Sequence, residues 1–440
     1  MMDVEAQIEQ WRRFLARHPA ITDDDAEEME GHLRDQIDAL NDAGLSPDEA
    51  FLVSVKRMGA HDAISREFAQ EHSERLWKQL VTPGTAARAH RRGIPAMLAF
   101  AVAAAVVVRA GIAVLGQDRA VANAPLALAP LVCYLAWTRR LSPTAWVAVG
   151  GAAASTALLL NLYPFADAGV TRGIAAAHGA VVMWFVVGVA YAGGEWRPAR
   201  RRMDFIRFTG EWVIYLALLA LGGGVLVGLA AGVFNAVDVD PATALGSWIV
   251  PMGAAGATIV AAWLVEAKQS VIENMAPVLT RVFSPLTVLL LGAVIVAFAV
   301  NAARLDANRD LLVVMALLLV LVLGLWLYAV SAREPLAAPG TFDWILLALL
   351  IGALIVDAIV LTSMVSRIAE FGLSANKVSA LGLNVVVLVN LVRSAWLCGG
   401  FLRGTRPFAT IERWQTDYLP VYAAWAALVM VVVPPVFGFV

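Results

Sequence analysis

The sequence predicts an all-α protein, a polytopic transmembrane helical bundle of about 11 spans with a small N-terminal helical domain. Of its 440 residues 60% are hydrophobic and only 15% are charged, whereas an average soluble domain is roughly 45–50% apolar and about 25% charged. Apolar stretches of about 20 residues, long enough to cross a bilayer, recur along the chain. Charge is also uneven, with a net of −9 over residues 1–80 and +7 over the remainder.

Residues 1–80 are expected to form a soluble helical domain. Four helices are predicted from apolar spacing and end signals, over residues 1–17, from Asp23 to Gly44, from Pro47 to Gly59 and from Asp62 to Leu80. Ser46, Pro47 and Glu49 are typical of a capping box at a helix start. Since its net charge is acidic, this domain is not expected to bind nucleic acid. It is either a solvated packing bundle or a module that docks a cytoplasmic protein partner.

The membrane part is expected to follow a basic linker at residues 81–93. A Pro/Gly break at 81–85 and the stretch from Arg88 to Arg92 mark this boundary. Within 94–440, hydropathy predicts eleven spans, at 94–115, 122–138, 144–163, 173–193, 212–234, 246–265, 285–302, 311–330, 343–363, 380–398 and 419–438. The second of these is short, which makes 10 or 12 spans the alternatives to eleven.

Lys and Arg residues in the connections predict the orientation. With the N-terminus in the cytoplasm, the cytoplasmic connections hold 16 of them and the outer connections hold six. Short cytoplasmic loops of membrane proteins carry such an excess of positive charge. The sequence therefore predicts a cytoplasmic N-terminus and an outer C-terminus.

Residues 367–378 read Arg-Ile-Ala-Glu-Phe-Gly-Leu-Ser-Ala-Asn-Lys-Val. This segment resembles the Arg-x-x-Glu-Tyr-Gly-Leu-Thr-x-x-Arg-Val signature of a bacterial membrane family, domain of unknown function 4153, and residues 276–286 also resemble that family. Phe371, Ser374 and Lys377 replace the usual Tyr, Thr and Arg. The lysine lacks the two-pronged geometry of an arginine.

The N-terminal part resembles the module called permease prefix domain 1. The resemblance lies in four segments, at residues 31–35, 44–51, 57–59 and 67–68. Such modules precede permeases and other membrane domains. The two resemblances together imply a bacterial inner-membrane protein, and neither implies an established activity.

Ionisable residues within spans are candidates for function, because a charge at the bilayer centre costs about 2.5–3.5 kcal/mol on insertion scales. We predict a polar binding site in the outer third of the membrane. Arg109 and Asp357 would form an ion pair there, with His178 and Asn384 nearby. The alternative is that Arg109 extends to the outer interface and Asp357 makes a structural bond.

The connection after the ninth span is a second candidate, formed by Arg367, Glu370, Phe371, Gly372 and Lys377. Gly372 is expected to end one helix and Ser374 to cap the next. This turn is either a gate or lipid-headgroup contact, or a rigid re-entry turn held by Arg367 and Glu370.

A third feature is the small-residue stripe Gly224, Gly228 and Gly232, which predicts close helix packing within the chain or in a homo-oligomer. The cluster from Arg197 to Arg207 is expected to attract anionic headgroups or to set topology.

Motifs for enzyme chemistry are absent from the sequence. It has no nucleotide-binding glycine loop and no His-Glu-x-x-His zinc motif, and its two cysteines are too few for a cysteine-rich metal site. We therefore expect no cofactor, and we favour a protein that is not an enzyme. The first hypothesis is a permease-like or channel-like body. The alternatives are a membrane sensor that signals through residues 1–80, and an intramembrane enzyme or binder of a lipid-linked substrate.

Overall fold

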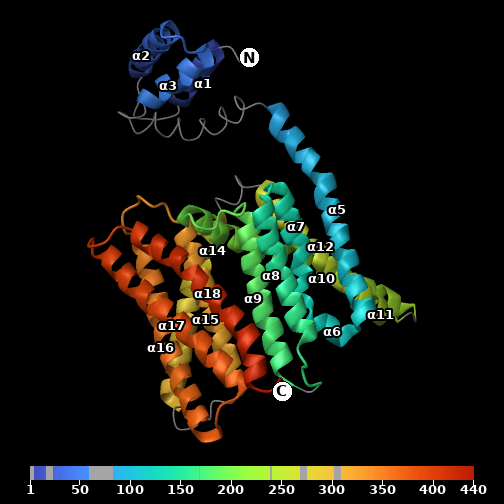
Figure 1. Ribbon diagram of the computed structural model, residues 1–440. Coiled ribbons are helices and arrows are strands. Elements are labelled where there is room, and N and C mark those ends of the chain that lie inside the picture. Colours follow the sequence, from blue (N-terminus) through green and yellow to red (C-terminus); the bar gives the residue numbers. More distant parts are fainter. Residues whose placement is uncertain are drawn as a thin grey trace. The chain divides into compact units, whose positions relative to one another are not determined.

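The computed structural model describes residues 4–15, 23–58, 83–167, 169–237, 240–267, 275–301 and 309–440. Every regular element in these ranges is a helix, which confirms the predicted all-α class. The chain forms two compact units, Met1–Ile94 and Pro95–Val440 (Figure 1).

The first unit contains α1 (Val4–Leu15), α2 (Asp23–Asp42) and α3 (Pro47–Met58). These helices share a small apolar core around Trp11, Leu33 and Phe51. Gly44 follows α2 with a φ of +94°, a conformation that favours glycine and stops a helix. The fourth helix predicted from Asp62 to Leu80 lies outside the described residues.

The predicted capping box at the start of α3 is present. The Ser46 backbone N–H and the Ser46 hydroxyl both donate to Glu49 Oε2, at 3.0 and 2.7 Å. Pro47 occupies the first helical position, where its missing N–H leaves no helical hydrogen bond unmade.

The second unit begins within α5 (Pro83–Leu115), at Pro95, and contains all the helices that follow. These are α6 (Gln117–Ala122), η1 (Ala124–Leu128), α7 (Ala129–Thr138), α8 (Pro143–Leu162), α9 (Thr171–Tyr191), α10 (Ala199–Ala236), α11 (Ala242–Ala244), η2 (Leu245–Ile249), α12 (Val250–Ala267), α14 (Met275–Asn301), α15 (Arg309–Ala332), α16 (Thr341–Phe371), α17 (Ala375–Leu402) and α18 (Ala409–Val436). Figure 1 shows the long ones gathered into a bundle.

The predicted linker at 81–93 is helical from Pro83 onward, because α5 begins there and continues to Leu115. A proline is well tolerated at the first position of a helix, so the Pro/Gly pair starts α5 instead of interrupting the chain. The basic stretch from Arg88 to Arg92 therefore belongs to this helix.

Ten helices of the described part are long and apolar enough to cross a membrane. The remaining predicted span, 122–138, corresponds to the shorter apolar segment Ala124–Thr138, which is η1 followed by α7. Five residues of 3₁₀-helix and ten of α-helix cover roughly 25 Å, close to the hydrocarbon thickness of about 30 Å.

Contacts at its two ends show that Ala124–Thr138 runs the length of its neighbours. Asn123, before η1, exchanges two side-chain hydrogen bonds of 3.1 and 2.7 Å with Asn161 at the end of α8. Arg139, after α7, bonds Glu266 at the end of α12 at 3.0 Å. We call these the Asn123 end and the Arg139 end of the bundle. The segment passes from one end to the other, which makes eleven passes through the bundle in the described part of the chain.

The largest apolar core lies among α14, α15, α16, α17 and α18 and includes Trp326, Leu349 and Leu391. Two glycines allow close approach of a ring elsewhere in the bundle. A Cβ atom at Gly210 would overlap the ring of Tyr328, and one at Gly382 would overlap the ring of Trp425.

Candidate functional site

Asp357 is the most buried ionisable residue of the described membrane helices. Its exposed fraction is 0%, and neither carboxylate oxygen has a hydrogen-bond partner among the residues that the structure describes. Its neighbours on α16, Ala353, Val356 and Val360, are buried apolar residues. A carboxyl group in such surroundings is costly to ionise, which makes it an unusual group to retain for packing alone.

Asp357 lies near the middle of α16, and its predicted depth in the outer third of the membrane stays a prediction. This helix begins at Thr341 and ends at Phe371, so that Asp357 is roughly 24 Å from its first residue and 21 Å from its last. The predicted span ended at residue 363, because the last two turns are polar and hydropathy does not detect them.

Asn384 lies at the same interface between α16 and α17, nearer the Asn123 end. Its exposed fraction is 2%, and its Nδ2 contacts Met364 Sδ at 3.5 Å. Met364 is two helical turns beyond Asp357 on the buried face of α16, roughly 10 Å along the axis. Asp357 and Asn384 therefore belong to one interface without bonding each other.

A closed ring of three polar side chains joins α17 to α18. Asn390 Nδ2 donates to Gln415 Oε1 (3.1 Å), Gln415 Nε2 donates to Ser394 Oγ (2.7 Å), and Ser394 Oγ donates to Asn390 Oδ1 (2.8 Å). All three residues have an exposed fraction of 0%. Hydropathy does not reveal this ring, because Gln415 precedes the predicted span at 419–438.

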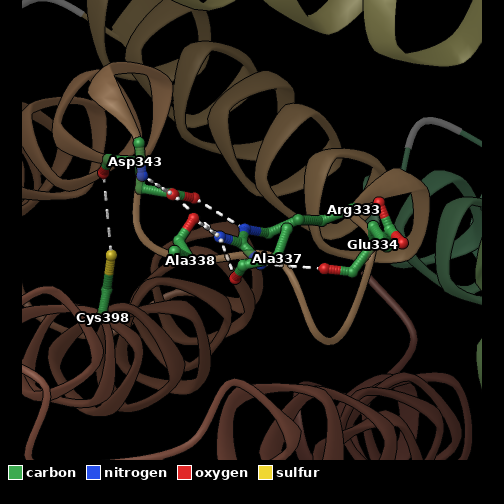
Figure 2. Close-up of polar contacts among 7 residues, drawn as sticks. Arg333, Glu334, Ala337, Ala338, Asp343 and Cys398 are labelled. Atoms are coloured by element: carbon green, nitrogen blue, oxygen red, sulfur yellow. Dashed lines mark hydrogen bonds and ion pairs between the residues drawn. The ribbon is translucent and has the colours of Figure 1, made fainter. Parts of the chain in front are cut away.

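An ion pair between Arg333 and Asp343 closes the interface at the Arg139 end (Figure 2). Arg333 lies just after α15, and Arg207 near the start of α10 bonds the neighbouring Ser331 carbonyl at 2.6 Å. The Cys398 thiol of α17 points at the Asp343 carbonyl, at 3.9 Å. Buried polar groups therefore recur along α16, α17 and α18 from this end past Asp357 to Asn384.

The second candidate, the turn between α16 and α17, closes the Asn123 end. Gly372 follows α16 with a φ of +73°, and the Ser374 side chain caps α17, as predicted. Lys377 Nζ donates to the carbonyls of Arg367 (3.1 Å) and Gly372 (2.8 Å). A cation on these last carbonyls of α16 is favourable. Phe371 is 65% exposed, and the predicted pairing of Arg367 with Glu370 stays a prediction.

The predicted ion pair between Arg109 and Asp357 is not formed in the described part of the chain. The Arg109 guanidinium lies over the ring of Trp248, 3.9 Å from its centroid. His178 Nδ1 contacts the Ile174 carbonyl of its own helix at 2.9 Å. In Figure 1, α5 and α16 lie at opposite sides of the bundle. The order of helices around a bundle is not encoded in hydropathy, which explains the error.

The glycine stripe of α10 is open. A Cβ atom at Gly224, Gly228 or Gly232 would meet no other atom within 4 Å. These glycines therefore pack no helix of the described chain, and homo-oligomer formation through them stays a prediction.

No protein-family model, curated protein or solved structure matches this chain. In the part of the chain that the structure describes, no group of three or more His, Cys, Asp or Glu residues is placed to hold a metal ion.

Proposed function

We propose that this chain is a permease-like protein in which the Asp357 carboxyl group takes up and releases a proton. One observation carries the proposal: the Asp357 carboxyl group, at the middle of α16, is fully buried and has no hydrogen-bond partner among the residues that the structure describes. An ion without a partner in the protein interior costs several kcal/mol. Burial of Asp357 among apolar side chains therefore favours the neutral, protonated carboxyl group.

Ionisable residues inside membrane bundles mark proton and ion pathways. Separation of α16 from α17 would admit water to Asp357, and a hydrated carboxyl group ionises readily. The buried polar side chains on either side, the ring through Asn390 and the amide of Asn384, would then offer hydrogen bonds to water or to a solute. A proton would thus be held in the closed form and released in the open form.

Proton flux through the reconstituted full chain tests this proposal. Vesicles of phosphatidylethanolamine and phosphatidylglycerol would enclose a pH-sensitive dye, with a potassium gradient and valinomycin to impose a membrane potential. We expect proton entry faster than in protein-free vesicles. We expect Asp357→Asn, which cannot exchange a proton, to reduce entry to the protein-free rate.

Asp417→Asn is the matched control, because Asp417 lies on α18 with a side chain that is 54% exposed. This variant should retain the wild-type rate. Equal rates for the wild type and Asp357→Asn would refute the proposal, as would a wild-type rate no higher than that of protein-free vesicles.

The proposal places the protein in the bacterial inner membrane with the Arg139 end in the cytoplasm. The support is the excess of Lys and Arg in the connections on that side, 16 against six. Residues 1–80 would then lie in the cytoplasm.

A second candidate function is binding of a lipid-linked substrate, favoured by an apolar groove of about 420 Å³ between α8, α9 and α18. The groove exists because several of the side chains that line it are small, among them Ala148, Ala152 and Ala424. An apolar groove of this size would hold an acyl chain. Ala424→Phe would fill it and should reduce the lipid that co-purifies, whereas Val225→Phe on the exposed face of α10 should not. Unchanged lipid content in Ala424→Phe would exclude this candidate.

A further inference from the structure

A polar pocket of about 210 Å³ lies at the Arg139 end, where α7 and α9 end and α10 begins. Side chains of both charges line it, and those with polar groups are Arg139, Tyr191, Arg201, Asp204, Arg207 and Glu211. None of them lines the apolar groove. Sites for drug-sized ligands measure about 300–1,000 Å³, so this pocket suits a smaller polar group.

Two of its arginines are held in place by the fold. Arg207 Nε and Nη2 donate to the Ser331 carbonyl at 3.2 and 2.6 Å. Arg139 Nη2 bonds Glu266 at 3.0 Å, and its guanidinium lies 4.8 Å from the centroid of the Tyr191 ring. A guanidinium has five N–H donors, so these bonds orient both groups and leave donors for a ligand.

The third arginine is more loosely held. The Arg201 side chain is 48% exposed, and its nearest carboxylate is that of Glu195 at 3.8 Å. Asp204, one turn further along α10, is half-buried and lines the same pocket. Arg201 is therefore free to close over a ligand that enters from the membrane surface.

The charges of the pocket nearly cancel while remaining on separate side chains. Three arginines line the pocket together with Asp204 and Glu211, and Glu266 forms an ion pair with Arg139. A simple anion would leave Asp204 without a compensating charge, and a simple cation would leave Arg201 and Arg207 without one. A small ligand with one charge of each sign compensates both.

We propose that this pocket binds a phosphoethanolamine group, with its phosphate at Arg201 and Arg207 and its ammonium group at Asp204. Arginine matches phosphate oxygens with two parallel N–H bonds. The pocket also lies where the apolar segments α7 and α9 end, the level at which phospholipid headgroups are found. The group would belong either to phosphatidylethanolamine or to free O-phosphoethanolamine.

Lipid binding to the detergent-purified, delipidated full chain tests the proposal by native mass spectrometry. We expect phosphatidylethanolamine to bind more tightly than phosphatidylglycerol. Arg201→Gln should weaken this binding about tenfold, the usual effect of losing a charge-assisted hydrogen bond. Asp204→Asn should remove the preference between the two lipids, because the ammonium group loses its partner.

Arg200→Gln is the matched control, since Arg200 precedes Arg201 on α10, is exposed and does not line the pocket. An equal loss of binding in this control would refute the proposal, as would wild-type binding in both Arg201→Gln and Asp204→Asn. Displacement of the lipid by O-phosphoethanolamine would identify the free compound as a ligand too. Failure of displacement alongside lipid binding would assign the site to the membrane headgroup.

Discussion

Arg333 and Asp343 form a buried ion pair with two parallel hydrogen bonds, which joins the residue after α15 to the first turn of α16 (Figure 2). Nε–Oδ1 and Nη2–Oδ2 are separated by 2.9 and 3.1 Å. Nη2 also donates to the carbonyls of Ala337 and Ala338, and Asp343 accepts the Gly340 N–H at 2.8 Å. One arginine and one aspartate therefore fix the whole connection between the two helices.

Removal of this carboxylate should strongly destabilise the protein. Asp343→Ala leaves the Arg333 guanidinium, which is 13% exposed, without its counter-ion, and breaking a buried pair costs about 3–5 kcal/mol. Asp417→Ala breaks the ion pair between Asp417 and Arg202. Because the Asp417 side chain is 54% exposed, this change should cost no more than about 1 kcal/mol. Thermal unfolding in detergent compares the two variants. Similar losses of stability in the two variants would show that the buried ion pair stabilises the protein no more than the exposed one.

Asp357 should behave in the opposite way. Its oxygens have no partner in the described chain, so Asp357→Val removes an unsatisfied polar group from an apolar interface. We expect a gain of about 1–3 kcal/mol together with loss of proton entry. Gln415→Leu, which breaks the ring with Asn390 and Ser394, should instead cost about 1–3 kcal/mol. A lower unfolding temperature for Asp357→Val would mean that this carboxyl group makes a stabilising contact.

The polar residues between α16 and α17 that stand out within one apolar stretch could be predicted from the sequence. An aspartate or asparagine inside an apolar stretch is visible in one dimension, and both Asp357 and Asn384 prove to be buried. The predicted pairing of Arg109 with Asp357 was wrong, because only the tertiary arrangement shows that Trp248 lies beside Arg109. The ring through Gln415 required the pairing of α17 with α18. Local signals, such as the Ser46–Glu49 capping box, were predicted correctly because they depend on neighbouring residues alone.

Two glycines with opposite surroundings provide a test of helix packing. Gly210→Ala would place a Cβ atom within the ring of Tyr328, which is 5% exposed and has little room to move. Overpacking of this kind costs about 1–3 kcal/mol. Gly228→Ala meets no atom within 4 Å and should not lower stability. Thermal unfolding of both variants measures the difference, and equal stabilities would argue against the close contact of α10 with α15.

Acid should loosen the first unit. The side-chain hydrogen bond from Arg34 lowers the pKa of Glu5, and the bond from the Ser46 hydroxyl lowers the pKa of Glu49, both below the usual value of 4.5. A carboxyl group whose pKa is lower in the folded state contributes stability above its unfolded pKa and loses it as the pH falls through the folded pKa. Protection of α1, α2 and α3 should therefore decline below pH 4.5.

Hydrogen exchange of the full chain, corrected for the intrinsic exchange rate at each pH, measures this protection. The double variant with Glu5→Gln and Glu49→Gln should have lower protection at neutral pH and a weaker dependence on acid. The same acid dependence in wild type and variant would assign the effect to other carboxyl groups.

The number of passes determines on which side Val440 lies. The contacts of Asn123 with Asn161 and of Arg139 with Glu266 make Ala124–Thr138 a full pass, so that within the second unit Pro95 and Val440 lie at opposite ends of the bundle. Ala166, after α8, donates its N–H to the Phe439 carbonyl at 3.0 Å, which places the C-terminal residues at the Asn123 end.

Reporter fusions test this arrangement in a bacterial host. With the Arg139 end in the cytoplasm, alkaline phosphatase fused after Val440 should be active, because this enzyme needs the oxidising exterior, and a green fluorescent protein there should remain dark. A fusion after Arg140 should give the reverse pattern. Active phosphatase at both positions would mean that the chain crosses the membrane an even number of times between Arg140 and Val440, and the eleven-pass bundle would have to be abandoned.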